Sequence, residues 1–410
     1  MEQTISLPAA ALADRESRRN AFLYAAAQAI NGSVPPICFS VGALTGYYLL
    51  GPDKSLATLP VTGYTVGVAL GAIPAAMLMR RVGRRLGFAI GSIIAIAGGL
   101  LAMLAIIYGS FVGFIVTMTI AGLAGAFVQQ YRFAAADSGS PELRTKAISW
   151  VLAGGIVAAV VGPQTVIHTH DLFDPIPFAG SFLAMSGLAA LGLVILLFLG
   201  GEARLPPKAE ATVATGRSLA EIARQPRFIG ALLCGMGSYA LMSLMMTSAP
   251  LAMVACGLGE SNAALGIQWH VLAMFGPSFI TGNLIARFGK LRIIALGMIL
   301  LAAAAAVALA GIDLYNFWVA MVLLGVGWNF GFIGATTLLT ETYRPEERSR
   351  VQGINDFAVF GAVSVASLSS GQLLAHVGWD WMNWGFFPIV IFCLGALAWM
   401  AGRGRAKAAA

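Results

Sequence analysis

The stretch RRVGRR at residues 80–85 returns later in the chain as RFGKLR at residues 287–292. Each is a short basic turn that follows a long apolar segment, and Gly83 and Gly289 stand 206 residues apart. Glycine lets the chain leave a helix, and arginines beside it favour the cytoplasmic face of a membrane. The repeat therefore predicts a chain built from two similar halves.

The composition predicts a membrane protein. Hydrophobic residues make up 58% and charged residues only 10% of the 410 residues, whereas soluble domains carry about 25% charged residues. Apolar segments of about 20 residues, the length that crosses a bilayer as a helix, recur throughout. They predict an all-α membrane protein with two six-helix bundles and twelve spans: 20–48, 57–79, 86–108, 111–134, 145–168, 178–200, 227–255, 262–286, 291–312, 315–339, 350–376 and 381–402.

The distribution of charge excludes nucleic acid as the reason for the net charge of +7. Of the 25 lysines and arginines, only Lys54 falls in a loop expected on the outer side. Such a bias places both termini in the cytoplasm. No cleavage site follows the polar start, so the first apolar segment is expected to be retained. The predicted organisation begins with a cytoplasmic segment (1–19) and a six-helix bundle (20–200). A polar cytoplasmic linker (201–226) then leads to a second six-helix bundle (227–402) and a cytoplasmic tail (403–410).

Two short motifs suggest a binding site. Met242 and Met246 are four residues apart, as are His270 and Met274, and this spacing puts each pair on one face of a helix. Three thioethers and one imidazole suit Cu(I) far better than Mg²⁺ or Ca²⁺. Methionine in an apolar helix is more often core filler, but an ionisable histidine within a membrane span is a functional hypothesis by default.

The depths of the two motifs agree. Met242 and Met246 lie 15 and 19 residues beyond Arg227, and His270 and Met274 lie 17 and 13 residues before Arg287. At 1.5 Å per residue, both pairs are expected roughly 20–28 Å above the cytoplasmic charges. One ion is therefore predicted to reach both.

The four cysteines lie in or at the ends of apolar segments without a CxxC motif, which argues against disulfides. Buried thiols are the simplest explanation. Cys234 and Cys256 flank the first motif, and the alternative is that they relay metal out of and into the site.

Other polar residues in the predicted spans have two explanations. Gln129 and Asn329 either line a cavity or connect helices by hydrogen bonds. Asn31 and Cys38, on the first predicted span, are candidate cavity or coupling residues. Asp356 lies inside a predicted span near its cytoplasmic end, where it either forms an ion pair with a nearby arginine or couples proton movement.

The sequence has no phosphate-binding loop of the GxxxxGK[ST] type, no HExxH motif and no Ser/His/Asp constellation. We therefore expect neither an ATP-driven pump nor an enzyme.

Over essentially its full length the chain resembles the major facilitator superfamily. The basic turns are similar to the superfamily's loop pattern, Gly-x-x-x-Asp-Arg-x-Gly-Arg-Lys, at Gly83 and Arg84 in the first half and at Gly282, Arg287, Gly289 and Lys290 in the second. The aspartate is missing in both halves. The resemblance implies alternating access to a site near the bilayer midplane, which the first span of each half lines.

The paired motifs resemble those of the CcoA-like subfamily of copper importers. That resemblance implies import of copper, as Cu(I), across the bacterial inner membrane for assembly of cbb3-type cytochrome c oxidase. It implies copper as substrate, no permanently bound cofactor, a monomer in a lipid bilayer and a cytoplasmic copper chaperone as partner. The metal ligands would be Met242, Met246, His270 and Met274.

Two alternatives stay open. Close relatives that carry riboflavin look alike elsewhere, so the four motif residues decide between copper and an organic solute such as riboflavin or a drug. A copper sensor or assembly scaffold would bind the metal without moving it.

Overall fold

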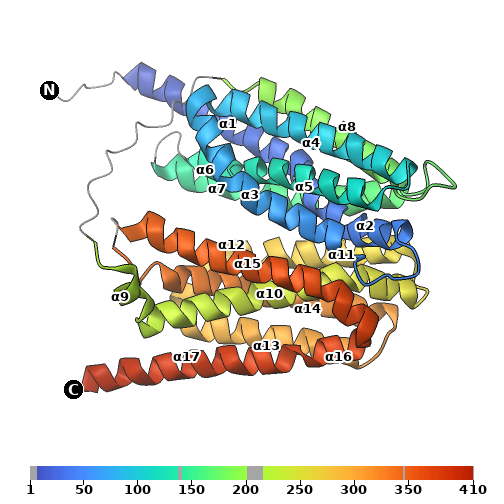
Figure 1. Cartoon of the computed structure of the whole chain (residues 1–410). Coiled ribbons are helices and arrows are strands. Elements are labelled where there is room, and N and C mark those ends of the chain that lie inside the picture. Colours follow the sequence, from blue (N-terminus) through green and yellow to red (C-terminus); the bar gives the residue numbers. More distant parts are fainter. Residues whose placement is uncertain (1–6, 137–140, 201–215, 345–346, 410) are drawn as a thin grey trace. The chain divides into compact units, whose positions relative to one another are not determined.

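The structure is a computed structural model that describes residues 7–136, 141–200, 216–344 and 347–409. Every regular element within them is a helix (Figure 1), which confirms the predicted all-α fold. In chain order the helices are α1 (Leu7–Asn31), α2 (Val34–Leu49), α3 (Leu59–Val82), α4 (Arg84–Ile107), α5 (Phe111–Val128), α6 (Tyr131–Ala136), α7 (Pro141–Thr169), α8 (Ala179–Leu197), α9 (Leu219–Ala223), α10 (Pro226–Ala255), α11 (Glu260–Phe275), α12 (Ser278–Phe288), α13 (Lys290–Leu309), α14 (Leu314–Leu339), α15 (Arg348–His376), α16 (Gly378–Trp384) and α17 (Phe386–Ala409).

Among the described residues, ten helices are long and apolar enough to cross a membrane, and the bent pair α11–α12 makes an eleventh. The predicted segment 20–48 is missing from this count because it divides into α1 and α2 at Gly32 and Ser33. Pro35 and Pro36 have no amide hydrogen to donate to the preceding turn, and their rings crowd its carbonyls. The predicted span over 20–48 therefore consists of two helices rather than one. The count of twelve spans and the cytoplasmic termini stay predictions.

The predicted helix over 262–286 is also interrupted. Its two parts, α11 and α12, meet at an angle of 43°. Gly276 and Pro277 lie between them, where proline removes a helical hydrogen bond and glycine lowers helix propensity. The predicted span over 262–286 is therefore bent, with the kink just after Met274.

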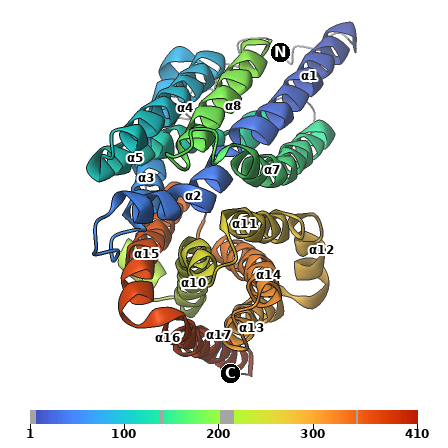
Figure 2. The ribbon, with the colours of Figure 1, turned by 90° about the vertical axis from the view of Figure 1, so that its right-hand side faces the viewer.

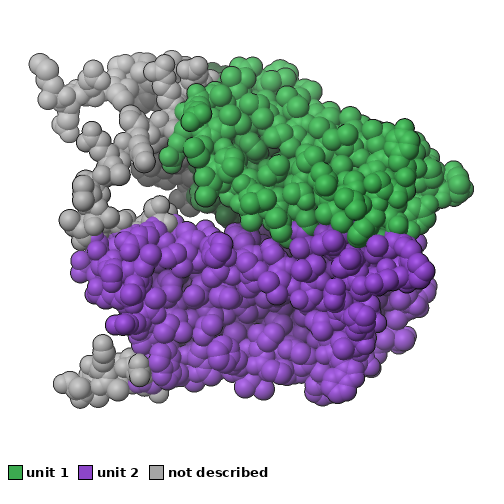
Figure 3. Space-filling view, in the orientation of Figure 1, with its two compact units in different colours: residues 1–49, 63–206 green, residues 50–62, 207–410 purple. Residues whose placement is uncertain are grey.

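The chain forms two compact units, residues 1–49 with 63–206 and residues 50–62 with 207–410 (Figure 3). Aromatic rings fill the core of the first, where Phe88 packs edge-on against Tyr131 with ring centroids 4.9 Å apart. In the second, Phe317 packs against Trp379 at 5.0 Å. The predicted boundaries at 200 and 227 stay predictions, since residues 201–215 lie outside the described part of the chain.

The two basic turns have the same backbone conformation. Gly83, before α4, has φ 83° and ψ 165°, and Gly289, before α13, has φ 87° and ψ 149°. Only glycine adopts this region without strain. The shared conformation at equivalent positions agrees with the duplication that the sequence predicts.

The charged side chains of these turns make different contacts in the two halves. Arg84 is buried, and its Nη1 donates to the Ala134 carbonyl at 3.3 Å. Arg287 lies over the ring of Phe288, with its Cζ 5.3 Å from the centroid. Lys290 forms an ion pair with Glu341 from the end of α14. The second turn is thereby tied to the loop that follows α14.

Three helices of the second unit, α10, α11 and α14, pack against one another and position the candidate site (Figure 2). Small residues bring their backbones close. A Cβ atom on Gly325 of α14 would lie 2.5 Å from the His270 carbonyl oxygen of α11, and one on Gly331 would lie 2.9 Å from Ser238 Cβ of α10. Such contacts leave no room for larger side chains.

Replacing Gly289 by alanine should lower the free energy of unfolding by about 1–3 kcal/mol, because the added Cβ is strained at this φ and ψ. The thermal midpoint of the detergent-purified protein measures the loss. Gly395→Ala is the matched control: it lies inside α17 with open space around an added Cβ and should stabilise by about 0.5–1 kcal/mol. Equal effects of the two substitutions would contradict the strain argument.

Candidate substrate site in the second unit

His270 on α11 is completely buried, with 0% of its surface exposed. Its Nδ1 lies 3.0 Å from the Met321 carbonyl oxygen of α14. A carbonyl only accepts hydrogen bonds, so Nδ1 carries the proton and Nε2 presents a lone pair. Nε2 is buried and has no hydrogen-bond partner among the described residues. A backbone carbonyl that fixes the tautomer and orientation of the ring is the usual support of a ligating histidine.

The contact between α10 and α14 sets the depth of the first motif. Ser238 of α10 lies level with Gly331 of α14. Met242 and Met246 follow Ser238 by four and eight residues. They therefore lie about 6 and 12 Å from this contact along the helix axis.

The contact between α11 and α14 sets the depth of the second motif. Gly325 lies six residues, or about 9 Å, from the α10 contact, and it faces the peptide groups between His270 and Met274. His270 is thus about 12 Å and Met274 about 6 Å from the same reference level. By this arithmetic Met246 lies at about the depth of His270, and Met242 at about the depth of Met274.

The faces of the helices agree with this pairing. On a helical wheel, Met242 and Met246 flank the direction of Met253, whose Sδ would lie 3.3 Å from a Cβ on Gly266 of α11. Both methionines are buried, and Met274 is half-buried. On an ideal helix, Met242 and Met246 therefore share the face of α10 that carries Met253. Coordination of one ion by all four stays a prediction.

Asn329 of α14 holds the kink between α11 and α12. Its Nδ2 donates to the Met274 carbonyl and to Ser278 Oγ, each at 2.7 Å, and its Oδ1 accepts from Thr281 Oγ1 at 2.6 Å. The Met274 carbonyl is among those that the kink leaves without a regular helical partner. Of the two explanations for Asn329, the structure shows the one in which it connects helices.

The other predicted polar residues are distributed over both units. Asn31 is buried in the first unit, and its Nδ2 donates to Ser92 Oγ at 3.1 Å and to Tyr131 Oη at 2.9 Å. Gln129 is exposed where α5 ends. Asp356 is exposed on α15, and its Oδ1 accepts a hydrogen bond from the side-chain Nδ2 of Asn355 at 3.3 Å. Cavity lining and proton coupling by these residues stay predictions.

All four cysteines are free thiols. Cys38 is buried, with its Sγ 3.9 Å from Met185 Sδ. Cys234 packs against α17, where its Sγ lies 3.7 Å from the Cys393 carbonyl oxygen. Cys256 is exposed at the end of α10, and partial burial raises the pKa of its thiol. The relay role of Cys234 and Cys256 stays a prediction.

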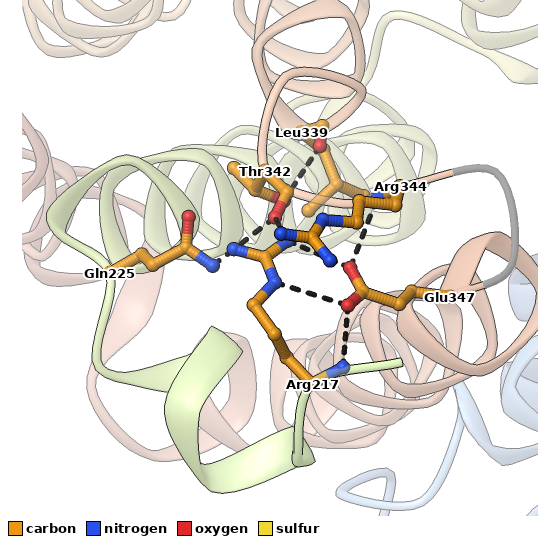
Figure 4. Close-up of polar contacts among 6 residues, drawn as sticks. All are labelled: Arg217, Gln225, Leu339, Thr342, Arg344 and Glu347. Carbon is orange, nitrogen blue, oxygen red and sulfur yellow. Dashed lines mark hydrogen bonds and ion pairs between the residues drawn. The ribbon is translucent and has the colours of Figure 1, made fainter. Parts of the chain in front are cut away.

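An ion pair that the sequence did not predict connects the linker to the loop after α14 (Figure 4). Arg217 Nε and Nη2 donate to the two oxygens of Glu347 at 3.0 and 2.7 Å, and the Arg217 amide donates to Oε1 at 2.8 Å. The Arg344 amide adds a fourth bond at 2.9 Å. These donors lower the pKa of Glu347 to about 2. We call this group the Arg217–Glu347 clamp.

The clamp escaped the sequence analysis because its partners lie 130 residues apart, outside any local spacing. The mixed-charge stretch at residues 341–350 was the only signal. Arg217 also donates to the Thr342 carbonyl at 3.0 Å, and Gln225 donates to the same oxygen at 3.2 Å. Bidentate pairs supported in this way are geometrically specific.

The family model described as Major Facilitator Superfamily matches residues 20–279 and 270–409. The chain belongs to the major facilitator superfamily. It is therefore a multi-pass membrane transporter, and bacterial transporters of this superfamily reside in the inner membrane.

Two relatives match nearly the whole of this superfamily member. The riboflavin transporter RfnT of Brucella anthropi is 48% identical over 379 residues, which cover 92% of this chain and 94% of the relative. YddS of Bacillus subtilis (strain 168), described as an uncharacterized MFS-type transporter, is 31% identical over 385 residues, or 90% of this chain and 88% of the relative. Neither name refers to copper, so the resemblance to copper importers stays a hypothesis.

Solved structures support the fold. The nucleoside transporter NupG matches with a TM-score of 0.69 over 94% of this chain and 99% of its own, at 14% identity. A peptide transporter of the POT family matches with a TM-score of 0.66 over 95% and 96%, at 13% identity. At these identities the likeness concerns the arrangement of helices alone.

Replacing Asn329 by leucine should destabilise the protein by about 1–3 kcal/mol, because the Met274 carbonyl and Ser278 Oγ lose their donor inside the bundle. Asn262→Leu is the matched control, because Asn262 Nδ2 donates only to the Leu258 carbonyl of the neighbouring turn among the contacts described, at 2.9 Å. This substitution should cost less stability. Thermal midpoints in detergent compare the two. A larger loss from the Asn262 variant would contradict the role of Asn329 at the kink.

The clamp should make stability depend on pH. The pKa of Glu347 is about 2 in the folded chain and about 4.3 in the unfolded chain. Its contribution to the free energy of unfolding is therefore full above about pH 4.3 and is lost as the pH falls toward 2. Glu347→Gln should therefore lower the thermal midpoint clearly at pH 7 and much less at pH 3. The control Glu260→Gln should change it little at either pH. A Glu347→Gln deficit that is constant with pH would exclude this linkage.

Proposed function

We propose that this transporter carries a riboflavin-like organic solute across the bacterial inner membrane by alternating access. The observation that supports it is the 48% identity to a riboflavin transporter over 92% of this chain and 94% of the relative. Relatedness of this extent covers both halves of the fold, and substrate sites of such transporters lie between the halves near the midplane.

Copper import is the second candidate, and the environment of His270 favours it. Its buried Nε2 is unpartnered among the described residues, while its Nδ1 is fixed by the Met321 carbonyl. Met246 of α10 lies at about the depth of His270, and Met242 lies about 6 Å away from that level, near the depth of Met274. Thioethers cannot be protonated, so such ligands hold Cu(I) without competition from protons. Copper would then be the transported substrate.

Purified protein in liposomes separates these functions. With riboflavin outside, the proposed function predicts saturable accumulation in the lumen and no more uptake of Cu(I) than in empty liposomes. Copper import predicts the reverse. A copper-binding scaffold would bind Cu(I) in detergent without accumulating it in the lumen. Absence of riboflavin uptake by well-folded protein would overturn the primary proposal.

Substitutions at the motif sharpen the distinction. If copper is the substrate, His270→Ala should abolish its uptake and Met246→Leu should reduce it roughly tenfold or more, because each removes a ligand. Met298→Leu is the matched control, since Met298 is also buried but lies on α13. The exchange of methionine for leucine conserves volume, so both variants should fold. A riboflavin carrier should tolerate both methionine substitutions alike.

A further inference from the structure

Four aromatic side chains of the second unit form a cluster beside the candidate site. Tyr239 of α10 packs against Trp328 and Phe332 of α14, with ring centroids 5.3 and 5.0 Å apart, and against Phe360 of α15 at 5.9 Å. Trp328 and Phe332 are stacked, with centroids at 5.2 Å and planes at 18°. We call these four residues the aromatic cluster.

The aromatic cluster contains an unused hydrogen-bond donor. Trp328 is only 7% exposed, and its indole Nε1 is buried without a hydrogen-bond partner among the described residues. Buried indole N–H groups normally have a partner, because an unpaired donor in a low-dielectric interior is costly. A second tryptophan of the same helix shows the usual situation, since Trp318 Nε1 donates to the Asn262 carbonyl at 3.2 Å.

Part of the ring surface of the aromatic cluster is exposed. Tyr239, Phe332 and Phe360 are only half-buried. Tyr239 precedes Met242 by three residues, so both lie on one face of α10. The cluster is therefore continuous with the face that carries the candidate site, about one helical turn away along α10.

We propose that the aromatic cluster binds the planar heteroaromatic ring of the transported solute. The ring stacks on the aromatic side chains, and Trp328 Nε1 donates to a carbonyl oxygen or ring nitrogen at its edge. This inference rests on the proposed transport of a riboflavin-like solute and assigns its ring to particular residues. Stacking tolerates any flat ring, whereas the indole donor selects rings with an acceptor at the edge.

Titration of the full-length protein in detergent with riboflavin, followed by its fluorescence, tests the proposal. Trp328→Phe keeps an aromatic ring and removes the N–H group, and it should raise Kd roughly tenfold. Trp318→Phe makes the same exchange on the same helix, where the indole already has a protein partner, and should change Kd less than about twofold. Phe332→Leu tests stacking separately and should also raise Kd several-fold.

Competition identifies the part of the solute that binds. Lumichrome, which has the ring system without the ribityl chain, should displace riboflavin, and ribitol should not. An unchanged Kd in both Trp328→Phe and Phe332→Leu would overturn the aromatic cluster as the site while leaving riboflavin transport intact. Failure of the wild-type protein to bind riboflavin would instead overturn the proposed function and this assignment together. Thermal midpoints show which variants are folded.

Discussion

Close approach of α14 to α10 and α11 is the constraint on which the candidate site depends. Gly325 and Gly331 lie where neighbouring backbone or a neighbouring side chain would occupy the space of a Cβ atom. Membrane helices gain stability from such packing because lipid offers no hydrophobic driving force between them. The two contacts fix the relative depths of α10 and α11, and with them the levels of the methionines and of His270.

Much of the fold was predictable because it depends on composition and spacing. The lengths of the apolar segments predicted a helical membrane protein. The turns at Gly83 and Gly289 predicted the internal repeat, which their shared backbone conformation supports. Breaks in the spans were missed although Pro35, Pro36 and Pro277 are visible in the sequence. Apolar length indicates where a span lies, whereas proline interrupts a helix through its hydrogen bonding and not through hydrophobicity.

The candidate site was predictable only in part. The spacing of Met242, Met246, His270 and Met274 predicts overlapping depths, since a helix has a fixed rise per residue, and the contacts of Gly325 and Gly331 agree with that prediction. His270 finds its hydrogen-bond partner on α14, and Asn329 of α14 finds its partners on α11 and α12. These pairings follow from tertiary packing. No sequence spacing encodes such partners. The Arg217–Glu347 clamp and the aromatic cluster were missed for the same reason.

Hydrogen bonding to α14 has a mechanical consequence for the second motif. One carbonyl of this helix, from Met321, aims the His270 imidazole, and one side chain, Asn329, holds the Met274 backbone at the kink. A displacement of α14 against α11 therefore disturbs both attachments simultaneously. Rocking of α14 would thus change the orientation of the His270 ring and the backbone position of Met274 together, without any change in the covalent chemistry of either residue.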